Sequence, residues 1–324
     1  MTEYRRTSVF LLLAALALLA GTVECLGYGF RTHSAVNLRA IETLPDDMRI
    51  GFEPYGKLLA RHASDPDRWK ESNPKESHKH WVHLEFYSDR PFTELPRDFD
   101  DIETKYAWET INHNGKLIWT IVDYTDSLTA AMADGRWMWV TYYASALGHY
   151  VADGHQPLHT TTNYDGQETG NDGIHLRFEI DMLDAHWDPS TMRLAEAEYV
   201  EDVFDFALCF LRDTNSGCEL IMRSDNEARS ASDGRFDATY YEALWDQTGR
   251  GVSGWLEDAT SDLGSLWYTA WVDAGRPDIP EPPQKLVVIR SPRVEEVKRS
   301  QTPVIAGLAG FGAAIIVTLL GLWK

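Results

Sequence analysis

The chain has little positive charge for its size. Its 324 residues include 30 Lys and Arg against 50 Asp and Glu, which gives a formal net charge of −20. A chain this acidic has no general electrostatic attraction for nucleic acid or for anionic lipid. It offers many carboxylates to cations, although solubility alone accounts for most of the acidic excess.

Alternating runs of apolar and polar residues, which are typical of half-buried strands, are absent, and no internal repeat occurs. Apolar residues recur at helical spacing instead. The stretches that show this spacing are 34–44, 48–63, 106–133, 137–151, 194–211 and 251–274. A polar turn is expected at 62–69. We therefore predict an all-α domain over residues 28–277. The sequence also lacks a nucleophile elbow and a phosphate-cradling glycine loop, so no covalent side-chain nucleophile is indicated.

Cysteine is scarce, with only three in the chain. Cys25 falls in the N-terminal segment described next, which leaves one possible pair. Cys209 and Cys218 flank a turn-like sequence, 213–217. In an exported protein we expect them to close a small disulfide loop. Free buried thiols are the alternative.

The N-terminus has the features of a secretory signal peptide. An arginine pair precedes an uninterrupted apolar run over residues 9–20. Small residues at Cys25 and Gly27 fit the positions before a cleavage site. The sequence therefore predicts a signal peptide over residues 1–27, a mature chain that begins at Tyr28, and export from the cytoplasm.

The C-terminus is also apolar. Residues 302–323 carry no charge and are long enough to span a bilayer as a helix. A proline-rich, charged linker over 278–301 precedes them. More basic residues lie before the apolar segment than after it, against the positive-inside rule, but a signal peptide followed by a long domain should dominate. We expect residues 302–324 to be a transmembrane helix or a cleaved lipid-anchor signal, so that the domain is tethered at the cell surface.

Two copies of one local pattern lie within residues 149–179. His149 and Asp153 stand four residues apart, and so do His175 and Glu179. On a helix such a pair lies on one face, and imidazole nitrogen and carboxylate oxygen both suit zinc. A single pair of His and an acid is more often a surface hydrogen bond than a metal site, since short motifs have a high false-positive rate. Two pairs close together favour metal binding.

Between the two pairs lies Pro157, which disfavours helix in the residue before it. The helix that carries His149 should therefore end near this proline. His159 would then lie on the turn just beyond that helix.

Nine positions together form a larger constellation. They are Tyr28, His33, Asp67, His80, His149, Asp153, His159, His175 and Glu179. At these residues the chain resembles the zinc-dependent phospholipase C superfamily. That group includes secreted bacterial phospholipases C, the clostridial alpha-toxin, and the fungal and plant single-strand-specific zinc nucleases. The motif HYVADGHQPLH, residues 149–159, is its most specific part. The resemblance covers residues 28–179 well and the later helices loosely.

The resemblance implies three zinc ions. One would be held by Asp67, His80 and His149, and would share Asp153 with the second. The second would use the terminal amine and carbonyl of Tyr28 together with His33. The third would use His159, His175 and Glu179.

The family pattern also separates neighbouring candidates. Asp67 is matched in preference to Asp65, and His80 in preference to His83. His78 and His155 are not matched, and His155 is expected to orient its neighbours or to face solvent. Two positions depart from the family. Tyr28 stands where Trp is usual, and His83 stands where Asp is usual.

The implied chemistry is phosphodiester hydrolysis. A hydroxide bridging two zincs would attack phosphorus, with Asp153 bridging the metals and Asp67 as proton acceptor. Two features resemble the phospholipases: the acid is Glu179, and the sequence separation between His159 and His175 is short. The five-residue separation between Tyr28 and His33 resembles the nucleases.

We therefore expect a phospholipase C-like enzyme that acts on a phospholipid head group. A single-strand nuclease is the alternative, with Trp69, Trp81 or Phe86 as a stacking platform. A catalytically silent, zinc-stabilised surface domain is a third reading. No protein partner can be inferred.

Overall fold

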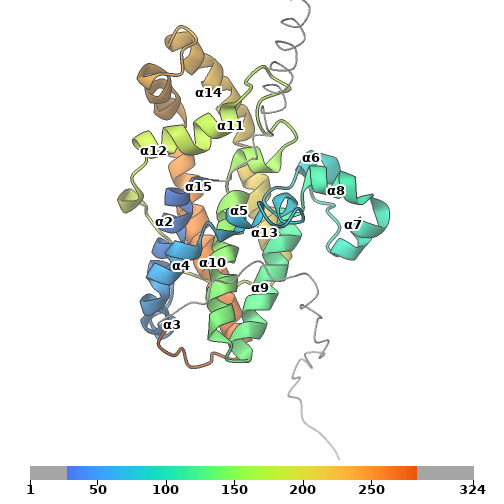
Figure 1. The fold of residues 1–324 in the computed structure, drawn as a ribbon, viewed down its shortest axis with the longest axis vertical. Helices are drawn as coiled ribbons and strands as arrows, with labels where there is room; N and C mark the ends of the chain where they lie inside the picture. Colours follow the sequence, from blue (N-terminus) through green and yellow to red (C-terminus); the bar gives the residue numbers. More distant parts are fainter. Residues whose placement is uncertain (1–27, 283–324) are drawn as a thin grey trace, which may run out of the picture. The chain divides into compact units, whose positions relative to one another are not determined.

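Helices account for the ordered elements of the computed structural model, which describes residues 28–282 (Figure 1). Within that range the strand-type pairing is limited to an isolated bridge between Val82 and Gly115. The all-α prediction is therefore confirmed for the described part of the chain. These residues belong to one compact unit.

The N-terminal helices are α2 (Phe30–Ala40), α3 (Asp46–Phe52), α4 (Gly56–His62) and α5 (Asp65–Trp69). A 3₁₀ turn that contains Pro54 separates α3 from α4, so the predicted second helix is interrupted. The polar turn predicted at 62–69 is wrong, because α5 occupies most of it. Pro66 lies at the helix start, and Asp65 and Asp67 lie in the first turn, where both residue types favour helix initiation.

Three short helices lie together beside the main bundle (Figure 1). They are α6 (Leu84–Tyr87), α7 (Phe99–Lys105) and α8 (Trp108–Asn114). Gly115 then breaks the chain before α9 (Leu117–Ala133). Its φ is +77°, and an added Cβ would lie 2.0 Å from the carbonyl oxygen of Trp81. The predicted stretch 106–133 is therefore split at the one residue that must be glycine.

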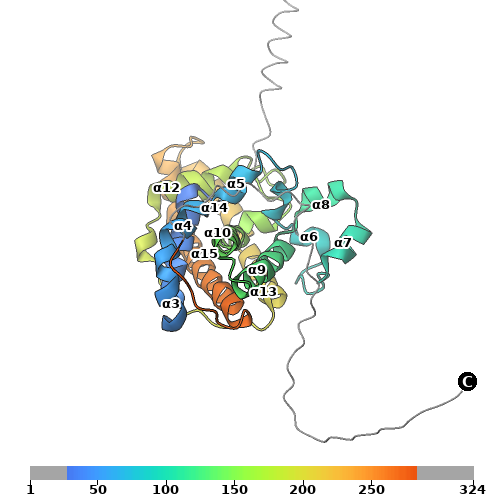
Figure 2. The same cartoon turned by 60° about the horizontal axis from the view of Figure 1, so that its bottom comes forward.

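The central element is α10 (Trp137–Gly154), which packs against α9, α15 (Ala238–Asp273), α2 and α4 (Figures 1 and 2). Its residues from Val140 onward are buried. Asn37 of α2 ties the bundle together, because its amide donates to the carbonyls of Leu59 and Ser145. The helix ends just before Pro157, as predicted.

The chain continues through a 3₁₀ turn, η4 (Pro157–Thr160), and a loop to α11 (Ile174–Leu176). A π-helical stretch, η5 (Arg177–Met182), and α12 (Leu183–His186) follow directly. A 3₁₀ turn, η6 (Pro189–Thr191), ends this part of the chain.

The helix predicted over 194–211 is wrong at its start, because α13 spans Val203–Asn215. Residues 192–202 run extended along α15 instead. Hydroxyl groups on one face of α15 accept hydrogen bonds from the backbone N–H groups of this segment. The pairs are Ala195 with Ser261, Glu198 with Ser265, and Val200 with Thr269.

Helix α14 (Cys218–Ala231) was not predicted. Its buried face includes Ser224 and Asp225, which conceal the apolar period in the sequence. The predicted disulfide is also wrong. Cys209 is a free, exposed thiol on α13, and Cys218 is a free thiol that donates to the carbonyl of Pro157 at 3.1 Å.

The last described residues pack onto the base of the bundle. Trp271 donates to the carbonyl of Pro277, and Tyr55 donates to that of Pro280, both at 2.9 Å. No helix within residues 28–282 is both long and apolar enough to cross a bilayer. The predicted signal peptide, the linker beyond residue 282 and the apolar segment 302–324 lie outside the described residues.

Candidate metal centre

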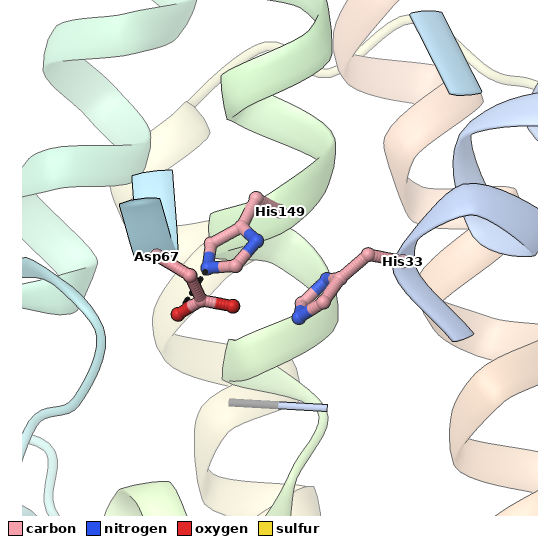
Figure 3. Close-up of side chains that lie close together, drawn as sticks. All are labelled: His33, Asp67 and His149. Carbon is pink, nitrogen blue, oxygen red and sulfur yellow. Dashed lines mark ion pairs between the residues drawn. The ribbon is translucent and has the colours of Figure 1, made fainter. Parts of the chain in front are cut away.

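Three helices far apart in sequence bring imidazole and carboxylate groups together. His33 from α2, Asp67 from α5 and His149 from α10 point toward one another (Figure 3). The rings of His33 and His149 stack with centroids 3.9 Å apart. The Nε2 atom of His149 lies 3.6 Å from Oδ1 of Asp67.

Asp153 and His80 complete this group, which we call the first cluster: His33, Asp67, His80, His149 and Asp153. Nδ1 of His80 lies 2.9 Å from both Oδ2 of Asp153 and Nε2 of His149. The other oxygen of Asp153, Oδ1, lies 3.6 Å from Nε2 of His33. Asp153 thus presents one carboxylate oxygen to each side, the geometry that a bridging ligand requires.

The second cluster consists of His159, His175 and Glu179. Nε2 of His175 lies 2.9 Å from Oε2 of Glu179 and 3.1 Å from Nε2 of His159. His159 comes from η4, just beyond α10, as predicted. Its Nδ1 also lies 3.7 Å from Oδ1 of Asp153, so the two clusters adjoin.

Backbone carbonyls fix the tautomers of three of these histidines. Each carbonyl accepts from an Nδ1 atom, so Nδ1 carries the hydrogen and Nε2 of a neutral ring presents a lone pair to the cluster. The pairs are His149 with Ala63, His159 with His80, and His175 with Tyr164, at 2.9, 2.7 and 2.9 Å. In the second cluster two lone pairs and a carboxylate then converge, an arrangement that needs a cation between them.

Buried polar atoms without a hydrogen-bond partner among residues 28–282 gather at the same place. They include both ring nitrogens of His33, Nε2 of His80, Oδ1 of Asp153 and Oε1 of Glu179. Such atoms are uncommon in folded proteins and destabilise the fold by about 1–3 kcal/mol each. A bound cation would satisfy those of these atoms that face the clusters, among them Oδ1 of Asp153 and Oε1 of Glu179, so both clusters can hold metal ions. The nitrogen and oxygen donors suit zinc.

The electrostatics of the clusters favour a cation. Burial lowers the pKa of His33 and of His80, which favours neutral rings that can offer a nitrogen lone pair to a metal ion. Burial also opposes charge on His149, but Asp153 and Asp67 outweigh it and raise its pKa. Burial alone would raise the pKa of Glu179, whereas His175 and His159 bring it down to about 2.

Lys70 is a member of the site that the sequence did not reveal. Its side chain is 1 % exposed, and its Nζ lies 2.8 Å from Oδ1 of Asp67. The Asp-x-x-Lys spacing across a helical turn was the available signal. A buried ammonium beside a candidate catalytic carboxylate can orient that carboxylate and can also attract an anionic substrate.

A cavity of about 440 Å³ lies beside the clusters. Its lining includes Lys70 and two ligand candidates of the second cluster, His159 and His175. Residues from α8 and the aromatic residues Trp81 and Tyr164 also line it. This volume fits one small polar group such as a head group or a single nucleotide.

Several predicted positions fall outside the clusters. His83 lines the cavity and stacks parallel to Tyr164 at 5.9 Å, and burial lowers its pKa to about 4. His155 binds Asp262 and stacks on Phe210. Trp69 is buried against Tyr142, so it is not available as the stacking platform that was considered.

Tyr28 is buried at the edge of the clusters. Its hydroxyl donates to the carbonyl of His155, and its ring lies 6.2 Å from that of His33. Burial raises the pKa of its phenol, and Glu179 and Asp153 raise it further. Tyr28 therefore lies within electrostatic reach of one carboxylate in each cluster.

The segment around α11 and η5, which carries His175, is anchored to α14. Asp225, which is fully buried, accepts from the guanidinium of Arg177 at 3.0 Å and from the amide of Asn171 at 2.7 Å. The hydroxyl of Tyr240 donates to the same carboxylate. This network holds η5, and with it Glu179, against α14 and α15.

No protein-family model matches this chain, and no curated protein matches it significantly. The functional interpretation therefore depends on the geometry of the two clusters and the cavity.

Proposed function

We propose that this protein is a zinc-dependent phosphodiester hydrolase, with phospholipase C-like activity as the first candidate. The observation that carries the proposal is the pair of adjoining buried clusters beside a cavity that Lys70 lines. Side chains with few structural uses are assembled there from six separate segments of the chain.

The first cluster offers ligands for two ions that share Asp153, with Tyr28 contributing to one of them. The second cluster offers ligands for a third ion. Zinc bound at these positions would supply Lewis-acid chemistry, lowering the pKa of water and offsetting phosphate charge.

The protein's own groups divide the remaining work. Lys70 would orient the carboxylate of Asp67 and attract the phosphate into the cavity. Asp67 would accept the proton from the attacking water, since Lys70 orients its carboxylate within the first cluster. Trp81 and Leu158, which line the cavity, would help to exclude bulk water from the phosphate.

Lipid and nucleic acid make different demands on the cavity. A cavity of about 440 Å³ holds a head group but not acyl chains, which would remain outside. The His175 and Glu179 pair and the predicted membrane attachment favour the lipid substrate. The rings of Trp81 and Tyr164 in the cavity favour the second candidate, a single-strand nuclease, because bases stack on aromatic side chains.

The test is hydrolysis by the full-length protein, with phosphatidylcholine vesicles and single-stranded DNA assayed on one sample. Asp67→Asn, which keeps the shape of the side chain, is the matched loss-of-function variant. Lipid cleavage that depends on Asp67 supports the first candidate, and DNA cleavage that depends on it supports the second. Zinc-loaded protein that cleaves neither substrate would contradict the proposal.

A further inference from the structure

A buried carboxylate behind His80 has no part in the function proposed above. Glu76 lies between α5 and the 3₁₀ turn η3 (Ser77–Lys79), and its side chain is 0 % exposed. Glutamate is rarely buried this completely unless it is paired. Its partners therefore indicate why the fold keeps a charge at this position.

Two side chains bind Glu76, and a third connects these two. Oε2 accepts from Nζ of Lys79 at 2.8 Å, and Oε1 accepts from the hydroxyl of Tyr150. The hydroxyl of Tyr124 lies 3.5 Å from both Nζ of Lys79 and the hydroxyl of Tyr150. We call these four residues the Glu76 network.

The Glu76 network borders the first cluster. Oε1 of Glu76 lies 3.9 Å from Nε2 of His80, and that nitrogen is buried without a hydrogen-bond partner among the described residues. The ring of Tyr150 packs edge-on against His80 and His149, with centroids 5.5 and 5.7 Å away. A movement at Glu76 or Tyr150 would therefore displace two candidate ligands.

His80 differs from the other histidines of the site. Three of them have their outer nitrogen held by a backbone carbonyl and face the cluster through Nε2. His80 faces the cluster through Nδ1, which lies 2.9 Å from Asp153, and its outer nitrogen faces the carboxylate of Glu76. Glu76 thus occupies the place that a carbonyl occupies for the others.

We propose that Glu76 is a positioning residue that accepts the Nε2 hydrogen of His80 and so leaves the Nδ1 lone pair for a metal ion. The 3.9 Å separation exceeds a hydrogen bond, and a shift of about 1 Å in either side chain closes it. Histidine ligands gain basicity and a fixed orientation from such outer partners. This inference depends on metal binding at the first cluster, as in the proposed function.

The test compares the zinc affinity of the full-length wild-type protein, Glu76→Gln and Tyr150→Phe by competition with a chelator. Each protein is also measured with Glu179→Gln added. This substitution impairs the second cluster, so that zinc bound at the first cluster dominates the measured affinity. Loss of an outer partner typically weakens metal binding by about 10–100-fold, and we expect this for Glu76→Gln. We expect a smaller loss for Tyr150→Phe, which removes one hydrogen bond to Glu76.

A spectroscopic readout and a control variant separate positioning from general damage. The visible absorption spectrum of bound Co²⁺ reports ligand geometry and should change in Glu76→Gln. Tyr87→Phe is the matched control, because Tyr87 also donates from a buried hydroxyl, to the carbonyl of Gly115 at 2.7 Å. We expect wild-type zinc affinity and an unchanged Co²⁺ spectrum in this control.

The outcomes are distinguishable. Wild-type affinity and spectrum in Glu76→Gln would overturn this inference and leave the proposed function standing. A wild-type protein that binds no zinc would overturn both. If Glu76→Gln does not fold, Tyr150→Phe decides: weaker zinc binding with wild-type thermal unfolding supports the inference, and wild-type affinity overturns it.

Discussion

Asp153 is the residue on which the two halves of the first cluster depend. One carboxylate oxygen lies near His80 and His149, and the other lies near His33. A carboxylate can satisfy donors or cations on both sides only while it carries its full charge. Its neutral amide analogue keeps the shape and loses that capacity.

We predict that Asp153→Asn removes close to two zinc ions from each chain and leaves the ion of the second cluster. Elemental analysis of the purified full-length variant measures this. Asp65→Asn is the control, because Asp65 binds His62 and Arg68 outside the clusters. Full metal content in Asp153→Asn would show that this carboxylate does not bridge two ions.

Lys70 should matter for turnover more than for metal content. Lys70→Met keeps the length of the side chain but removes the charge that pairs with Asp67. A hydrogen bond to a charged group contributes about 1.5–3 kcal/mol, which corresponds to a loss of about 10–100-fold in kcat/KM. Steady-state kinetics measure the effect, with the exposed Lys57→Met as control. Unchanged kcat/KM would remove Lys70 from the site.

Helix α10 was predictable because its sequence carries two signals at once. Its apolar residues recur at helical spacing, and His149 and Asp153 stand four residues apart on it. Residues 194–202 show the same apolar spacing but are not helical, because hydroxyl groups of α15 satisfy their backbone N–H groups and no local helix is needed. Helix α14 was missed because Ser224 and Asp225 occupy its buried face.

The close packing of α10 predicts opposite effects for two glycine substitutions. A Cβ at Gly148 would lie 1.8 Å from Oδ1 of Asn37 and 2.7 Å from a methyl of Leu263, whereas a Cβ at Gly254 would meet nothing within 4 Å. Gly148→Ala should lower the free energy of unfolding by about 1–3 kcal/mol through overpacking. Gly254→Ala should raise it by about 0.5–1 kcal/mol through helix propensity.

Denaturant unfolding with a chelator present compares the two variants without a contribution from metal. Equal stability of Gly148→Ala and the wild type would contradict the packing described for α10.

The anchor between η5 and α14 gives a further prediction. Asp225→Ala would leave the guanidinium of Arg177 buried without its carboxylate partner. Breaking a buried pair in this way should lower the free energy of unfolding by about 3–5 kcal/mol. Denaturant unfolding measures this loss of stability. Asp233→Ala is the control, because the side chain of Asp233 is 85 % exposed. A loss below 1 kcal/mol would show that the network does not hold η5 in place.

The structure brings most of the predicted site residues together, although several of the surrounding helices differ from the prediction. Eight of the nine predicted positions place a side chain in one of the two clusters, and Tyr28 lies beside them. Spacing along the chain indicated the two pairs of His with an acid and the place of His159, and the resemblance to a known family implied the other positions. Lys70 was missed although it stands three residues after Asp67, because such a spacing is also common in exposed ion pairs, and Glu76 was missed because a single acid in a polar segment has no distinctive spacing. The predicted Cys209–Cys218 disulfide was wrong because spacing alone does not show which way two thiols point.

The net charge of −20 belongs to the entire chain, yet a concentrated part of it is buried at the clusters. Asp67, Asp153 and Glu179 are all nearly inaccessible to solvent. Such buried carboxylates among neutral imidazoles are stable only with compensating positive charge. Lys70 supplies one such charge, and bound metal would supply the rest.

The most direct test is the zinc content of the purified full-length protein, measured by elemental analysis after dialysis against metal-free buffer. We predict close to three zinc ions per chain, falling to about one in Asp153→Asn. A folded protein that retains no zinc would contradict it, and the clusters of histidine and acidic side chains would then be hydrogen-bonded core residues.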